Sequence, residues 1–214
     1  MKKLLLSVLL LAAAPMGIMT AQQSPAGAGT RPNFVFDDDG GAVQIVPAGL
    51  ASASAKEFHG GAMLPSVQQV SIFLGGGWGS AGIRSREIVL SDLAASDPAG
   101  FAELSTHNVA IQRAAPLQED FSDLSKTSLN DLSIQHKLAE MLQSKAIPAP
   151  QASTVYVIFL APGVNSSLGG HKPGTDYAAY HNFFHLQAGE IHYVVVPFAQ
   201  SGDVQRGAAA HALV

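Results

Sequence analysis

Two hydrophobic segments near the C-terminus predict strands. Residues 155–160 form an unbroken apolar run that is too short for a buried helix. Such a run is typical of a strand in a sheet that helices cover on both faces. Residues 193–198 form a second apolar segment, but Pro197 cannot donate a ladder hydrogen bond. We therefore expect this strand either to lie at a sheet edge or to end near Pro197.

A third hydrophobic segment, residues 67–74, predicts a strand that leads into the sequence Gly75-Gly76-Gly77-Trp78-Gly79. A glycine run after a strand can bind phosphate, but a phosphate loop would continue with Gly-Lys-Ser or Gly-Lys-Thr, and this run continues differently. We interpret these glycines as a tight exit from a central strand, with Trp78 covering the core.

Residues 127–144 have the clearest helical periodicity, and Ser128 is the expected N-cap. The side chains expected on the core-facing stripe of this helix are Leu132, Leu138, Met141 and Leu142. The remaining segments predict a helix over residues 84–95, a strand over 108–116, a polar loop over 116–126 and an alanine-rich helix from Val204 onward. This alternation of strands and helices predicts an α/β fold.

Residues 1–21 have the layout of a secretory signal peptide. Lys2 and Lys3 precede an apolar stretch over residues 4–14, and small residues lead to a cleavage site after Ala21. A transmembrane anchor is the alternative, but the apolar stretch is about half of the roughly 20 residues that a spanning helix needs. No later segment has the character of a membrane span. We expect an exported protein, either secreted or periplasmic.

Residues 22–57 are rich in Ala, Gly, Pro and Ser, which predicts a disordered linker ahead of a single α/β domain over residues 58–214. The linker contains the triplet Asp37-Asp38-Asp39. A calcium loop is one interpretation of this triplet, but its spacing does not match the EF-hand pattern. A solvated acidic segment is the simpler interpretation.

Charge and cysteine content exclude several classes of function. Removing residues 1–21 takes away two of the 12 Lys and Arg residues and none of the 16 Asp and Glu residues, so the net charge changes from −4 to about −6. Nucleic-acid and anionic-membrane binding rely on clustered basic residues, so neither is expected. The chain contains no cysteine, which excludes disulfides and thiolate metal ligands.

His181 and His185 are the strongest candidates for a metal site. If residues 176–187 form a helix, both imidazoles lie on one face and can share a zinc ion. The spacing is that of His-Glu-x-x-His, but Asn182 occupies the position of the general-base glutamate and cannot take a proton from a metal-bound water. The alternative is an aromatic cluster in which both histidines are merely hydrogen-bonded.

His192 and His211 are further candidates. His192 opens the strand over residues 193–198 and faces the same side as Val194, where it either acts together with His185 or is a half-buried strand histidine. His211 lies in the alanine-rich helix, which stops at Val214 without a capping residue. We interpret this end as a C-terminal truncation of the domain.

Three segments resemble a group of secreted bacterial proteins that share a Tyr-His-x-x-Phe segment, a Tyr-x-x-x-Pro strand and a Ser-His-Glu-Leu-x-Glu helix. The matching residues are 180–184, 193–197 and 210–214. His59-Gly60-Gly61, followed by an apolar strand and Gly-Trp, also resembles the opening of the plant phosphate-induced, or EXORDIUM-like, secreted proteins.

The resemblance implies a zincin-like fold, a three-layer sandwich with a mixed sheet and a metal helix that follows the edge strand. His211 would be the first metal ligand, and the second would follow Val214. Ala212 occupies the position of the glutamate that activates water, and loss of that base removes a contribution of about 10²–10⁴-fold to the rate.

Three functions are therefore expected as alternatives. The first is an exported cell-envelope or extracellular protein that binds an extracellular ligand or cell-wall component and lacks peptidase activity. The second is a zinc hydrolase that uses His181 and His185, with His192 or His211 as a further ligand and Glu190 as the nearest candidate base. The third is a carbohydrate-binding or structural surface protein without metal, for which Trp78 and Tyr177 should be exposed on one face.

Overall fold

The computed structural model describes residues 33–36, 41–50, 66–96, 98, 101, 110–111, 117–121, 128–187 and 189–213. These residues all belong to one compact unit, Arg31–Val214. The expected signal peptide, the acidic triplet Asp37-Asp38-Asp39 and His59 lie outside the described residues.

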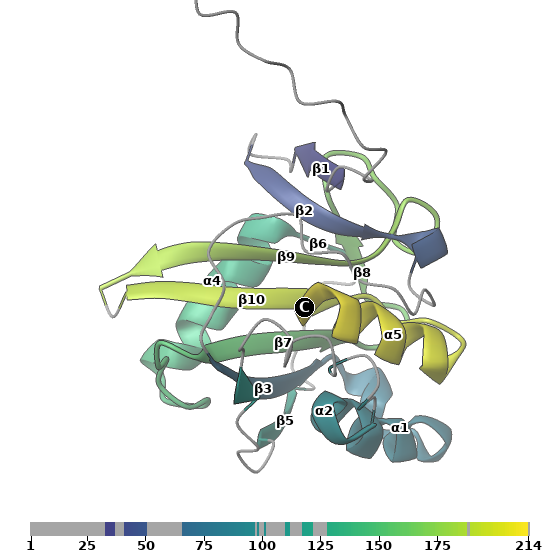
Figure 1. Ribbon diagram of the computed structural model, residues 1–214, viewed down its shortest axis with the longest axis horizontal. Coiled ribbons are helices and arrows are strands. Elements are labelled where there is room, and N and C mark those ends of the chain that lie inside the picture. The colour runs from purple at the N-terminus through teal and green to yellow at the C-terminus, as the bar shows by residue number, and fades with distance from the viewer. Residues whose placement is uncertain are drawn as a thin grey trace, which may run out of the picture. The chain divides into compact units, whose positions relative to one another are not determined.

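A mixed β-sheet forms the centre of this unit (Figure 1). Its strands are, in order across the sheet, β1 (Asn33–Phe36), β2 (Ala42–Pro47), β9 (Tyr177–Leu186), β10 (Gly189–Val196), β7 (Thr154–Leu160), β3 (Ser66–Leu74) and β4 (Ala110–Ile111), and β5 (Leu117–Phe121) also pairs with β3. Strand β10 pairs with β7, β7 with β3, and β3 with β4 and β5, all in parallel. The remaining pairs, β1–β2, β2–β9 and β9–β10, are antiparallel. A separate pair of short parallel strands joins β6 (Ser128–Asn130) to β8 (Asn165–Ser167).

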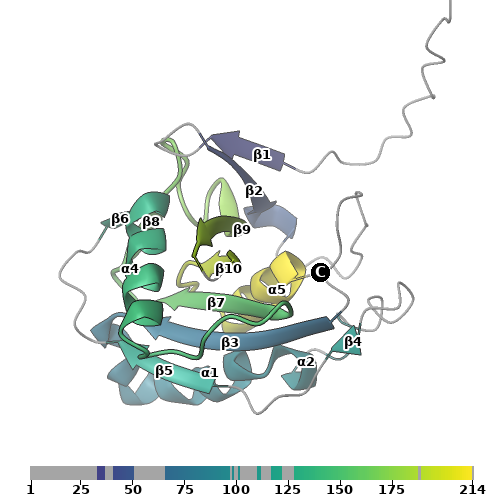
Figure 2. The same cartoon turned by 90° about the vertical axis from the view of Figure 1, so that its left-hand side faces the viewer.

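Helices cover both faces of the sheet, as the apolar run in β7 predicts. Every residue of β7 is buried, and its side chains alternate between two hydrophobic clusters. Helix α4 (Asp131–Gln143) covers the face with Tyr156 and Ile158, and α1 (Ala81–Ser91), α2 (Leu93–Ser96) and α5 (Gly202–Leu213) cover the face with Val157 and Phe159 (Figure 2). The α/β prediction is confirmed, and the sheet is mixed.

The exit from β3 has the role that the sequence predicts for its glycines. Gly75 has φ +112°, and a Cβ at this position would lie 2.8 Å from the Cβ of Ala161, so only glycine fits without rearrangement. The following 3₁₀ turn, Gly76–Gly79, inserts Trp78 into the core, where its indole Nε1 donates a hydrogen bond to the Phe159 carbonyl oxygen at 3.1 Å. This turn closes one end of the hydrophobic cluster that lies between the sheet and helices α1, α2 and α5.

Helix α4 begins later than predicted and uses a different cap. Asn130, not Ser128, caps the helix, and its side-chain oxygen accepts a hydrogen bond from the Ser133 amide at 2.9 Å. Ser128 lies in β6 instead. The buried stripe includes Ile134, Leu138 and Met141, whereas Leu132 is exposed.

Two segments that were predicted to be irregular contain strands. β1 and β2 fall within the predicted linker, and β5 falls within the predicted polar loop over residues 116–126. In β2, Val43 and Val46 are buried and the strand pairs with β9. The surrounding Ala, Gly and Pro residues obscure this short apolar pattern in the sequence, so the linker prediction is wrong for these residues.

The largest correction concerns the helix predicted over residues 176–187, because Tyr177–Leu186 form strand β9. Tyr180, Asn182 and Phe184 alternate with His181, Phe183 and His185 along this strand. The strand pairs with β10 on one side and with β2 on the other. Aromatic residues favour strands. The two neighbouring strands provide the backbone hydrogen bonds that a helix would form within itself. β10 ends at Val196, so the terminus predicted near Pro197 is confirmed, and β10 lies inside the sheet.

Candidate functional site: a histidine face on strands β9 and β10

The register of β9 and β10 places several histidines on the side of the sheet that faces α5. His181 pairs with Val194, Phe183 with His192, and His185 with Glu190. Val194 belongs to the hydrophobic cluster beneath α5. Alternate residues of a strand share a face, so all of these side chains project on the α5 side. With His211 of α5, the four polar residues His181, His185, Glu190 and His192 make up what we call the histidine face.

Glu190 joins two of these histidines. Its Oε2 atom lies 3.4 Å from Nε2 of His185, and its Oε1 atom lies 3.1 Å from Nε2 of His192. The His185 side chain is 70% exposed, and the exposed fractions of Glu190 and His192 are 41% and 34%. The carboxylate therefore bridges two imidazoles at a surface that solutes can reach.

Phe183 packs between the same two imidazoles. Its ring centroid lies 5.7 Å from that of His185 in an edge-on arrangement, and 6.1 Å from that of His192. Half of Phe183 is nevertheless exposed. This apolar ring restricts the positions that the two imidazoles can occupy.

His181 lies deeper and is influenced by two other histidines. Burial lowers the pKa of His181, and the charges of His192 and His211 lower it further. His181, His192 and His211 come from β9, β10 and α5, so three elements contribute to this part of the face. The neutral imidazole, which is the form that binds metal ions, is favoured at His181.

The structure brings together the histidines that the sequence singled out, but it does not give His181 and His185 the helical spacing that was expected. All four predicted ligands belong to the histidine face, but His181 and His185 are four residues apart on a strand and not on a helix. At about 3.3 Å per residue their backbones are separated by roughly 13 Å, which is too far for one zinc ion to join two rings that stand side by side. Within the described residues, no three acidic or histidine side chains surround a common point as they stand.

Within the described residues of α5, no carboxylate lies next to His211 in the helix. Ala212 is 6% exposed and packs in the cluster between α5 and the sheet, together with Ala208, Ala209 and Ala210. The acidic residue of α5, Asp203, lies at the opposite end of the helix and pairs with Arg206 at 3.0 Å.

A buried polar network on the other face of the sheet escaped sequence reasoning. Asp131 is 1% exposed and accepts hydrogen bonds from the hydroxyl of Tyr193 at 2.7 and 2.8 Å, from Asn182 at 3.0 Å and from Gln135 at 2.8 Å. Burial and the Asp131 carboxylate both raise the pKa of Tyr193. Because the carboxylate is enclosed, this network attaches α4 to β9 and β10. The only sequence signal was an acidic residue in the first helical turn.

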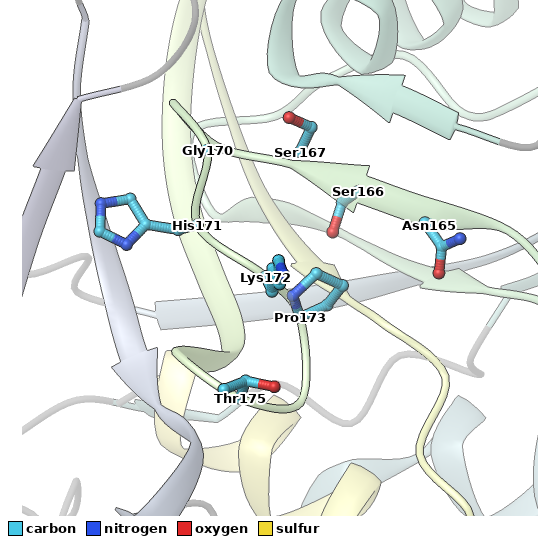
Figure 3. Close-up of a pocket in the computed structure, with 8 residues that line it drawn as sticks. All are labelled: Asn165, Ser166, Ser167, Gly170, His171, Lys172, Pro173 and Thr175. Carbon is cyan, nitrogen blue, oxygen red and sulfur yellow. The ribbon is translucent and has the colours of Figure 1, made fainter.

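A shallow hollow of about 410 Å³ lies beside β8. Its lining residues are Asn165, Ser166, Ser167, Gly170, His171, Lys172, Pro173 and Thr175. The labelled side chains do not turn toward a common point (Figure 3). The Ser166 hydroxyl is already hydrogen-bonded to the Tyr177 hydroxyl at 2.7 Å. The histidine face therefore offers the more concentrated chemistry.

No protein-family model, curated protein or solved structure matches this chain. No helix among the described residues has the length and apolar character needed to cross a membrane.

Proposed function

We propose that this chain is an exported protein of zincin-like architecture that binds an extracellular ligand or cell-wall component and does not hydrolyse peptides. The observation that carries the proposal is the environment of position 212. In the family that the sequence resembles, this position supplies the base, but here a methyl group packs into the core between α5 and the sheet. Position 212 therefore supplies no general base.

The position of α5 supports the zincin-like part of the proposal. α5 follows β10 and packs beneath the sheet, as the resemblance implies for the metal helix, and His211 lies close enough to His181 to lower its pKa. One feature differs from the expectation, because β10 is an inner strand and not an edge strand. A zincin centre on α5 would lack its general base, since Ala212 replaces the glutamate.

The zinc hydrolase alternative has weaker support. It needs His181 and His185 on one ion, and their positions along β9 do not permit this. Glu190, the expected base, accepts contacts from His185 and His192 on both of its oxygens. A base that activates water needs a free oxygen directed at that water.

The carbohydrate-binding alternative also loses the feature on which it depended. Trp78 and Tyr177 are both fully buried, so neither offers a stacking surface. The hollow beside β8 remains a polar surface without aromatic side chains among its lining residues.

Peptide hydrolysis by the chain from Gln22 onward tests the proposal. We expect no cleavage of fluorescent casein or of a quenched peptide library above a protein-free blank, with or without added zinc chloride. Cleavage that a chelator abolishes and that zinc restores would contradict the proposal and favour the hydrolase.

Export has a separate test. Expression of the full chain in a Gram-negative host, followed by fractionation and intact-mass measurement, should yield a periplasmic or secreted product that begins at Gln22. Retention in the cytoplasm with residues 1–21 intact would contradict export.

A further inference from the structure

The hairpin of β9 and β10 brings together three side chains of the kinds that bind metal ions, His185, Glu190 and His192. His185 and Glu190 are direct cross-strand partners, and Glu190 and His192 are two residues apart on the same face of β10. Direct cross-strand partners have Cβ atoms roughly 5 Å apart. Short side chains from such positions reach one point above the sheet.

Two distances within this group lie in the range found between ligands of one metal ion. Zinc binds imidazole nitrogen and carboxylate oxygen at about 2.0–2.2 Å, so two ligands at a tetrahedral angle lie about 3.3–3.5 Å apart. The Glu190 oxygens lie 3.4 Å from the His185 nitrogen and 3.1 Å from the His192 nitrogen. Ordinary surface ion pairs also have such distances, so accessibility and donor type must be considered as well.

Both considerations favour a metal ion. Two imidazoles and one carboxylate, completed by water, are a ligand set that zinc uses in proteins, and imidazole selects borderline ions over calcium or magnesium. The three side chains are 70%, 41% and 34% exposed, so an ion can enter from solvent. The Glu190 oxygens point to different histidines, so an ion shared by all three side chains requires the 70% exposed His185 ring to turn past Phe183 toward the side of His192.

We propose that His185, Glu190 and His192 form a surface site for a zinc-class divalent transition metal ion. The inference rests on the proposed function in one respect, since it names a metal ion as a ligand of the histidine face. It is independent of His181 and His211, and it assigns Glu190 a ligand role in place of a catalytic one. His192 is the residue that connects this site to the deeper histidines.

Isothermal titration of zinc chloride into the chain from Gln22 onward, purified without a histidine tag and at about pH 7.5, tests the proposal. We expect one zinc per chain. His185→Ala and Glu190→Gln should each weaken binding roughly tenfold or more, because each removes a direct ligand. Both positions are exposed, so both variants should keep the far-UV circular dichroism of the parent chain.

His136→Ala is the matched control, because His136 is exposed on α4, on the opposite face of the sheet. It should bind zinc as the parent chain does. His181→Ala and His211→Ala should also retain the zinc stoichiometry. Absence of binding, or binding that is lost in His181→Ala and His211→Ala but kept in Glu190→Gln, would overturn the site.

The two proposals can fail separately. Peptide cleavage by the zinc-loaded chain, with zinc binding that depends on His185 and Glu190, would overturn the proposed function and support the metal site. Absence of both zinc binding and cleavage would overturn the metal site and agree with a protein that is not a peptidase.

Discussion

His192 and Tyr193 are neighbours in the chain, but their side chains lie on opposite faces of β10. His192 contacts Glu190 on the histidine face, and Tyr193 donates a hydrogen bond to the buried Asp131 on the α4 face. The period of two along a strand separates an accessible polar surface from an enclosed one. Substitutions at these adjacent positions should therefore have different consequences, one for binding and one for stability.

Tyr193→Phe should destabilise the fold. It removes a hydrogen bond to a buried carboxylate, for which the loss is about 1.5–3 kcal/mol. Tyr156→Phe is the matched control, because its hydroxyl donates to the neutral Pro148 carbonyl oxygen at 2.7 Å and the loss should be about 0.5–1.5 kcal/mol. Urea unfolding measures both free energies. Equal losses in the two variants would contradict a stronger hydrogen bond from Tyr193 to the Asp131 carboxylate.

His181 should make the fold less stable in acid. Burial, with the charges of His192 and His211, holds the pKa of His181 below the value of about 6.5 in the unfolded chain. The unfolded chain therefore takes up the proton more readily, and this contribution to stability is present above about pH 6.5 and is lost as the pH falls below it.

The free energy of unfolding at about pH 7.5 and about pH 5.5 measures this effect. The decrease on acidification should be smaller in His181→Gln than in the parent chain. His136→Gln, at an exposed position of α4, should behave as the parent chain does. An unchanged pH dependence in His181→Gln would contradict the role of His181.

At the scale of elements, two helices owe their positions to single polar side chains. Asn130 fixes the start of α4, and Arg86 of α1 fixes the segment that leads into α5. The Asn130 cap is local, whereas the Arg86 hydrogen bond joins residues 113 positions apart in the chain.

Asn130→Ala should cost about 0.5–2 kcal/mol of stability, because the Ser133 amide loses its acceptor. Ser128→Ala, at the position that the sequence favoured as the cap, should change stability by less than about 0.5 kcal/mol, since Ser128 is an exposed residue of β6. Thermal unfolding of the two variants distinguishes these caps. A larger effect for Ser128→Ala would place the start of the helix where the sequence predicted it.

Arg86→Lys should weaken the attachment of α5 to α1. The guanidinium donates to the carbonyl oxygens of Ala199 at 2.6 Å and Gln200 at 2.9 Å, and it lies 5.0 Å from the centroid of the Phe198 ring. A lysine cannot reproduce this fork of donors. We expect faster amide hydrogen exchange in α5, with little change in α4. Arg84→Lys, at an exposed position of α1, should leave exchange in α5 unchanged.

At the scale of the whole molecule, β3, β7 and β10 contribute to both hydrophobic clusters, so the two cores share their strands. A perturbation on one face reaches the other through the same backbone. The described residues should therefore unfold as one cooperative unit.

Trp78 reports this transition, because it is the single tryptophan of the chain and is 1% exposed. It contacts Phe73 at 5.0 Å between ring centroids. In urea, tryptophan fluorescence should change at the same midpoint as far-UV circular dichroism. Two separate midpoints would show that the α1 side of the core unfolds independently of α4.

The sequence alone determined the elements whose pattern allows only one structure. The unbroken apolar run of β7 predicts a strand that is buried on both faces. The glycines after β3 indicate a point where another part of the chain approaches the backbone closely. The alanine-rich stretch of α5 has high helix propensity. Within the candidate site, the sequence singled out His181 and His185 by their spacing, His192 by its place at the start of a strand, and His211 by the resemblance of its helix.

Only the tertiary structure decided the conformation of residues 177–186 and the partners of their side chains. His181 and His185 share a face both in a helix and in a strand, so their spacing cannot distinguish the two. The backbone hydrogen bonds to β2 and β10 make the segment a strand. The register of the hairpin then brings Glu190 opposite His185. The buried Asp131 carboxylate accepts a hydrogen bond from Tyr193, which lies 62 residues further along the chain. Such contacts depend on strand pairing and on helix packing, which local sequence patterns do not specify.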